Sequence, residues 1–113
     1  MKAAHPEEEA PDLTAVAPAL EEFKERRLFG DLWKRSELTP RDRSVVTLAT
    51  VIARNQAIEL PDQLDRALDN GVDPQEISEI ITHLAFYSGW GNAMLAVAAA
   101  KDIFEKRVGS QPK

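Results

Sequence analysis

Hydrophobic residues recur at three- and four-residue intervals along most of this chain, which is the spacing of one face of an α-helix. The period becomes regular at Pro18, is interrupted at Gly30, and returns in segments 40–54, 59–70, 74–88 and 92–107. No stretch alternates polar and apolar residues as a half-buried strand would. The pattern therefore predicts an all-α fold, a compact helical domain of about five to six helices.

Several helix boundaries are marked by local chemistry. Thr39 and Asp73 are residues that cap helix N-termini, and each precedes a proline, which is favoured at the first helical position. Glu76, three residues after Asp73, completes a capping box. Asn70-Gly71 predicts a helix end, because glycine readily adopts the left-handed conformation that closes a helix.

The first residues differ from the rest of the chain. Residues 1–12 carry three consecutive glutamates, two prolines and no apolar period, so we predict an acidic flexible arm there and a single helical domain over 13–113. At 113 residues the chain can build one core, but it is small enough that association with further copies would add stability.

Two surface features favour a homo-oligomer. The helix predicted for 40–54 is apolar around most of its circumference, and its narrow polar stripe must face water, a cavity or a partner subunit. The stripe consists of Arg43, Thr47, Thr50 and Arg54. Phe86 projects from an otherwise polar helix face, which is typical of a partner surface. The alternative is that the N-terminal arm covers Phe86.

Composition narrows the possible functions. The formal net charge of −5 disfavours nucleic acid and anionic membrane surfaces as partners. No run of residues is apolar for the length of a membrane span, and no signal peptide is visible. Cysteine is absent, which excludes disulfides, thiolate metal sites and thiol redox chemistry. A cytoplasmic location is therefore expected.

The segment from His83 to Met94 has the most distinctive set of side chains in the sequence. It holds the single histidine outside residues 1–12, the single tyrosine and one of two tryptophans. Such a cluster indicates either a tightly specified corner of the fold or a small-molecule pocket. Taken alone, His83 is more often a hydrogen-bonded structural residue, Glu59 an acid serving the helix dipole, and Arg43 a solvated side chain. One histidine among scattered carboxylates lacks metal-ligand spacing, so no metal site is expected.

Four segments carry a resemblance to a known family. They are Leu38-Thr-Pro-Arg-Asp-Arg-Ser-Val-Val-Thr-Leu-Ala, Glu59-Leu-Pro, Arg66-Ala-Leu-Asp-Asn-Gly-Val and Glu79-Ile-Ile-Thr-His-Leu-Ala-Phe-Tyr-Ser-Gly-Trp. Through them, residues 32–108 resemble the carboxymuconolactone decarboxylase family, whose helical fold is that of the alkylhydroperoxidase-like proteins. The resemblance implies this fold, a homo-oligomer (a trimer or a hexamer built from two trimers), and a cofactor-free lyase of aromatic compound catabolism.

The chain departs from both branches of that family. The peroxidase branch uses two cysteines and a histidine at positions that Gln56, Glu59 and Gln63 occupy here, so thiol peroxidase activity is not expected. The decarboxylase branch commonly has a histidine in place of Gln63 and a proline in place of Gly91. Glutamine forms hydrogen bonds but carries no proton at neutral pH, which puts the family's full activity in doubt.

The implied reaction suggests roles for particular residues. Loss of carbon dioxide from a carboxylated lactone leaves a carbanion that delocalises into the lactone carbonyl, so no cofactor is needed. The enzyme needs a cation for carboxylates, hydrogen-bond donors for the enolate oxygen, and an acid to protonate carbon. The candidates are, in that order, Arg43 or Arg41; Tyr87 or Trp90, with Gln63 as a further substrate-binding residue; and His83 paired with Glu59 or Glu79.

Two hypotheses therefore remain. The first is a cofactor-free lyase acting on a small carboxylate or lactone, with the site built from helices of one or two subunits. The second is a non-catalytic oligomeric homologue that binds a small ligand or a protein partner. Gln63 favours the second hypothesis, and the segment from His83 to Trp90 favours the first.

Overall fold

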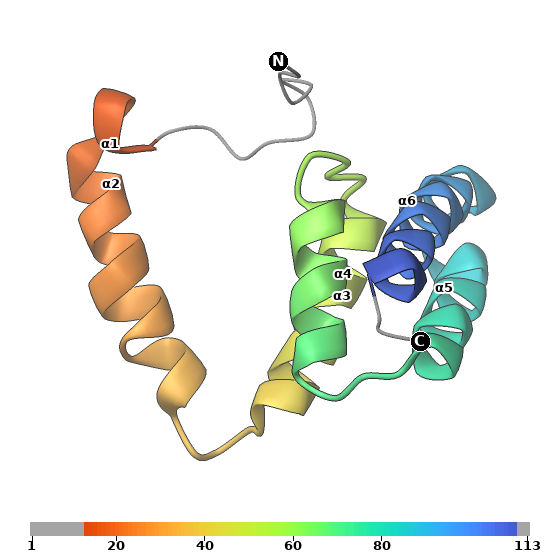
Figure 1. The fold of residues 1–113 in the computed structure, drawn as a ribbon, viewed down its shortest axis with the longest axis horizontal. Helices are drawn as coiled ribbons and strands as arrows, with labels where there is room; N and C mark the ends of the chain where they lie inside the picture. The colour runs from red at the N-terminus through yellow and green to blue at the C-terminus, as the bar shows by residue number, and fades with distance from the viewer. Residues whose placement is uncertain (1–12, 111–113) are drawn as a thin grey trace.

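The computed structural model describes residues 13–110, in which every regular element is helical (Figure 1). The predicted acidic arm of residues 1–12 lies outside the described residues. The elements are α1 (Leu13–Val16), α2 (Pro18–Phe23), the π-helix η2 (Lys24–Phe29), the 3₁₀-helix η3 (Leu32–Lys34), α3 (Pro40–Ala53), α4 (Leu60–Asp69), α5 (Pro74–Tyr87) and α6 (Trp90–Ser110). The prediction of an all-α fold is confirmed for this range. Within it, no helix has both the length and the hydropathy that crossing a bilayer requires.

Helices α3 to α6 pack around one hydrophobic core. Its fully buried large side chains come from α3, α4, α5 and the turn before α5: Leu48, Ile52, Leu60, Leu64, Val72 and Ile77. Helix α6 contributes mainly small side chains, since Ala93, Ala96 and Ala100 are buried along one face together with Ile103. Small residues let the backbone of α6 approach its neighbours closely, which accounts for the alanine-rich sequence.

The helix boundaries predicted at Thr39, Asp73 and Gly71 are confirmed in atomic detail. The Thr39 hydroxyl accepts a hydrogen bond from the Asp42 amide at 3.0 Å, and Asp73 and Glu76 form the reciprocal capping box. Gly71 has φ of 99°, and the amide of Val72 donates to the carbonyl of Ala67 at 2.9 Å. This is the Schellman closure of a helix, which a left-handed glycine makes easy.

The last helix begins earlier than the sequence indicated. We expected it to start at Asn92, whereas α6 starts at Trp90 and leaves a junction of Ser88 and Gly89. Gly89 has φ of 112°, which reverses the chain within these two residues. The Asn92 side chain donates to the carbonyls of Ala53 at 3.0 Å and Ser88 at 3.3 Å, and so holds the first turn of α6 against the end of α3.

The N-terminal helical segment, defined here as α1, α2 and η2 (residues 13–29), stands away from α3–α6 (Figure 1). None of its residues is buried. It joins the core through Gly30 and η3. A Cβ atom at Gly30 would lie 2.7 Å from the Arg26 carbonyl oxygen and 2.8 Å from that of Glu25, so a larger residue would disturb this bend.

Candidate functional site

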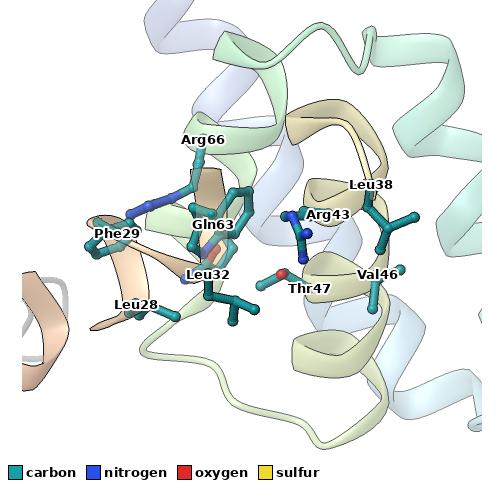
Figure 2. Close-up of a pocket in the computed structure, with 10 residues that line it drawn as sticks. Leu28, Phe29, Leu32, Leu38, Arg43, Val46, Thr47, Gln63 and Arg66 are labelled. Atoms are coloured by element: carbon teal, nitrogen blue, oxygen red, sulfur yellow. The ribbon is translucent and has the colours of Figure 1, made fainter. Parts of the chain in front are cut away.

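A cavity of about 250 Å³ lies between the base of the N-terminal helical segment and helices α3 and α4 (Figure 2). We call it the arginine cavity. Its apolar wall comes from residues before α3 and one residue of α3: Leu28, Phe29, Leu32, Trp33, Leu38 and Val46. Its polar side chains come from α3 and α4: Arg43, Thr47, Gln63 and Arg66. Part of the polar stripe predicted for α3 therefore faces a cavity, one of the three surroundings that the sequence left open.

Helical spacing brings these four polar side chains together. Arg43 and Thr47 are four residues apart on α3, and Gln63 and Arg66 are three apart on α4, so each pair shares a helix face. The two helices are packed side by side, with the carboxamide of Asn70 donating to the buried hydroxyl of Ser44 at 2.9 Å. The cavity is thus lined by rigid elements rather than by long loops.

Both arginines have unsatisfied donors. The Nε atoms of Arg43 and Arg66 are buried and have no hydrogen-bond acceptor among residues 13–110. Neither guanidinium forms an ion pair with a carboxylate of the described chain. A buried N–H without a partner costs about 1–3 kcal/mol, and both of these N–H groups belong to arginines that line one cavity. The cavity is therefore a candidate place for an anionic ligand.

The surroundings of the two arginines fix their positions. Arg43 donates from a terminal guanidinium nitrogen to the carbonyl of Arg35 at 3.3 Å. The guanidinium of Arg66 lies over Phe29, 4.5 Å from the ring centroid, and 5.8 Å from that of Trp33. A cation stacked on aromatic rings keeps its charge without a carboxylate partner. Arg66 therefore remains a free charge for a ligand.

Glu59 supplies an acid close to the cavity. It is the exposed residue that precedes α4, and its carboxylate accepts a hydrogen bond from the Gln63 side chain at 3.4 Å. This distance is long for a hydrogen bond, so the contact is weak. Gln63 lines the cavity itself, and Glu59 lies one helical turn before it.

His83 lies elsewhere. Its ring stacks on Tyr87 at a centroid distance of 4.7 Å and an angle of 13°, as expected for residues one turn apart. It borders a second hollow of about 330 Å³ with Val45 and Glu79. Val45 and Arg43 are about 200° apart around α3, so the two hollows lie on opposite sides of that helix. In one copy of the chain, Glu79 rather than Glu59 is the acid beside His83.

The other candidates also lie outside the arginine cavity. Arg41 pairs with Glu76, which ties the start of α3 to the start of α5. Tyr87 is 79% exposed, and Trp90 makes an edge-on contact with Phe86 at 6.3 Å. A role for these residues in substrate binding stays a prediction.

Sequence reasoning missed Arg66 and the two aromatic residues that its guanidinium contacts, Phe29 and Trp33. The signal was present, since Arg66 follows Gln63 at the spacing that places two residues on one helix face. Trp33 and Phe29 gave no such signal, because their contact with Arg66 joins segments far apart in the chain.

The resolved pKa shifts lie away from both hollows. Hydrogen bonds to Asp69 and Asp65 raise the pKa of Arg107, and these contacts clamp α6 onto α4. A hydrogen bond to Glu105 raises the pKa of Lys101 on the surface of α6. Within residues 13–110, no group of three or more histidine, aspartate or glutamate side chains converges to hold a metal ion.

Comparison with known proteins identifies the family. The model of the carboxymuconolactone decarboxylase family matches residues 18–102. The chain belongs to this family. It is 33% identical over 91 residues to the 4-carboxymuconolactone decarboxylase of Acinetobacter baylyi, which covers 80% of this chain and 67% of that protein. It is also 36% identical over 61 residues to the nitrosuccinic acid decarboxylase of Metarhizium robertsii, covering 54% of this chain and 43% of that protein.

The family match confirms the resemblance and extends it. The sequence segments placed the likeness in residues 32–108, whereas the match begins in α2 at residue 18. It therefore includes most of the N-terminal helical segment and every residue that lines the arginine cavity. The two relatives are both decarboxylases by name, although their named substrates differ.

Proposed function

We propose that this protein is a cofactor-free decarboxylase of a small acidic substrate, and that the reaction takes place in the arginine cavity. The observation that carries the proposal is the pair of buried Nε donors of Arg43 and Arg66, which have no acceptor among residues 13–110. The names of the two relatives support the reaction type. With a lactone as the substrate, we further propose a role in the catabolism of aromatic compounds and a cytoplasmic location.

The cavity separates the two tasks of such an enzyme. Arg43 and Arg66 bind a carboxylate or carbonyl that stays on the substrate, because a cation held on the departing carboxylate would oppose its loss. The departing carboxylate faces the apolar wall around Leu28, Leu32 and Val46. An apolar surface disfavours the charged carboxylate relative to neutral carbon dioxide.

The electron pair of the broken C–C bond then moves into the substrate. In a lactone it reaches the carbonyl oxygen, and in a nitro acid it reaches the nitro group. Thr47, Gln63 and the arginines are the donors positioned to stabilise the resulting oxyanion. A proton must finally be added to carbon, and we assign this step to Glu59, whose side chain contacts that of Gln63 beside the cavity.

His83 remains a proposed proton donor under one condition. Because it lies on the opposite side of α3 from the arginine cavity, it serves that cavity only if it comes from a neighbouring copy of the chain. Within one copy, His83 and Glu79 form a separate pair of titratable groups beside the second hollow.

One observation favours a second candidate, a non-catalytic protein that binds an acidic ligand. Gln63 provides a hydrogen bond but no proton, in the position where the decarboxylase branch commonly has histidine. The same arginines would hold the ligand, and no bond would be broken.

Turnover and binding assays separate these candidates. Carbon dioxide release is measured with carboxymuconolactone and with nitrosuccinic acid, and binding of succinate is measured by calorimetry, for the wild type, Arg43→Met and the control Arg54→Met. Turnover that Arg43→Met abolishes and Arg54→Met retains supports the enzyme. Succinate binding that needs Arg43, with no turnover, supports the ligand-binding homologue. Absence of both would show that the arginine cavity is not the functional site.

A further inference from the structure

The N-terminal helical segment carries an apolar face that its own chain leaves uncovered. Leu20 is 54% exposed and Phe23 is 59% exposed, and both border a hollow of about 460 Å³ that extends to Leu28 and Leu32. The opposite side of the segment is polar, with Glu22 and Arg26 forming an ion pair at 3.2 Å. A helix with one apolar side is stable in water only when that side is covered.

A second uncovered apolar surface lies along α5 and α6. A groove of about 370 Å³ lies between these helices. Its lining includes the buried core residues Ile77, Ile81 and Ala100, the more exposed Val97 and Phe104, and polar side chains: Ser78, Thr82, Lys101 and Glu105. On α6, the exposed side chains of Trp90, Met94 and Val97 follow one another at four- and three-residue spacing, so they continue the groove along one helix face. Phe86 of α5 extends this surface through its contact with Trp90.

We propose that the N-terminal helical segment of one copy of the chain lies in the α5–α6 groove of a second copy. An amphipathic helix in an apolar groove is a recurrent mode of recognition. The dimensions agree, since the continuous helical part of the segment, residues 18–29, is about 18 Å long and the groove from Trp90 to Phe104 about 21 Å. Each copy thus provides both halves of the contact.

The area is sufficient for a stable assembly. The exposed parts of the apolar side chains amount to roughly 400–500 Å² on the segment and a similar area on the groove, whereas a standard interface buries about 800 Å² per partner. When two copies exchange segments reciprocally, both contacts join the same pair, so the two surfaces together reach that area. Such a reciprocal exchange closes into a two-fold dimer.

The groove of the same copy is out of reach. The segment is anchored through η3 to α3 and α4, and α1 and α2 lie on the side of the molecule away from α5 and α6 (Figure 1). The bend at Gly30 is set by close backbone contacts and leaves no room for a side chain.

Docking of the segment would also complete the arginine cavity. The segment leads directly into Leu28, Phe29 and Trp33, which form the wall opposite α3. Held by a neighbour, this wall keeps its position over Arg66. This consequence rests on the proposed function, whereas the docking itself does not.

The first test is the state of association. Light scattering after size exclusion is expected to show an oligomer for the wild type and for the control Glu22→Ala/Arg26→Ala, which alters the polar side of the same helix. Leu20→Asp/Phe23→Asp is expected to raise the dissociation constant about 100-fold or more. Its core should still unfold cooperatively, because both side chains are exposed in one copy. A monomeric wild type, or an oligomer that the aspartates leave intact, would overturn the proposal.

The second test uses the absence of cysteine from the chain, which makes engineered disulfides unambiguous. Phe23→Cys and Val97→Cys proteins are mixed and oxidised gently, and a crosslinked pair containing one of each is expected. Glu22→Cys mixed with Val97→Cys is the matched control and should crosslink far less. Crosslinking of Phe23→Cys mainly to itself, or within a single chain that carries both cysteines, would contradict the proposed pairing. Neither test measures catalytic activity, so the results of both tests can be interpreted even where the proposed function fails.

Discussion

The two sides of α3 differ in how their polar groups are satisfied. On one side, Arg43 faces the arginine cavity, where its Nε and that of Arg66 are buried without an acceptor in residues 13–110. On the other side, His83 is exposed and its ring rests on Tyr87. Unmatched buried donors are costly and are retained where a ligand uses them, whereas an exposed histidine costs nothing. The comparison supports our proposal that function lies on the arginine side, although the residue types first drew attention to His83.

The largest expected effect concerns the arginine side. Arg66→Met removes a cation that no described carboxylate balances, and we expect a loss of about 100- to 1,000-fold in kcat/KM for decarboxylation. Steady-state kinetics with carboxymuconolactone checks this, with Arg54→Met as the control that should change kcat/KM less than about twofold. Equal effects of both substitutions would show that a cation outside the arginine cavity matters as much as Arg66, and would remove the argument for the cavity.

A substitution at Gln63 tests whether the arginine cavity lacks a titratable group that the reaction needs. Gln63→His places a titratable group beside Arg66, and we expect a gain of about tenfold in decarboxylation of carboxymuconolactone near neutral pH. The circular dichroism spectrum should not change, because Gln63 is only partly buried at the cavity. No gain in a folded protein would indicate a site adapted to another substrate.

Two substitutions at His83 test the other side. Because His83 is remote from the arginine cavity in one copy, we expect His83→Gln to keep kcat/KM within about fivefold and His83→Ala to act mainly on stability, if at all. Glutamine imitates a hydrogen bond but not a proton transfer. A loss above about 100-fold in both variants would mean that His83 of a neighbouring copy enters the reaction.

The smallest effect is on stability, and it differs between the two sides of α3. Arg43→Met removes a buried unsatisfied donor and is expected to raise the free energy of unfolding by about 1 kcal/mol while lowering activity. His83→Ala should change it by less than about 0.5 kcal/mol, because the side chain is exposed. Urea denaturation measures both. Destabilisation by Arg43→Met would show that its hydrogen bond to the Arg35 carbonyl outweighs the cost of the unsatisfied Nε.

The amino-acid sequence by itself determined helices α3 to α6 and their ends, except for the start of α6. The helix ends are set by residues that bond to backbone groups a few positions away: Thr39, Asp73 and Gly71. Their effect can therefore be predicted without knowledge of the tertiary structure. The exposure of Phe86 could also be predicted, because it follows from the helical period alone. In the structure this side chain is 78% exposed.

Tertiary structure alone decided which polar residues meet. Arg41 and Arg43 were equal candidates in the sequence, yet they lie about 200° apart around α3. One therefore reaches Glu76 of α5 and the other the arginine cavity. The stacking of Arg66 on Trp33 likewise depends on where η3 crosses α4. Local sequence fixes the direction of a side chain on its own helix, but the packing of distant helices decides what that side chain contacts.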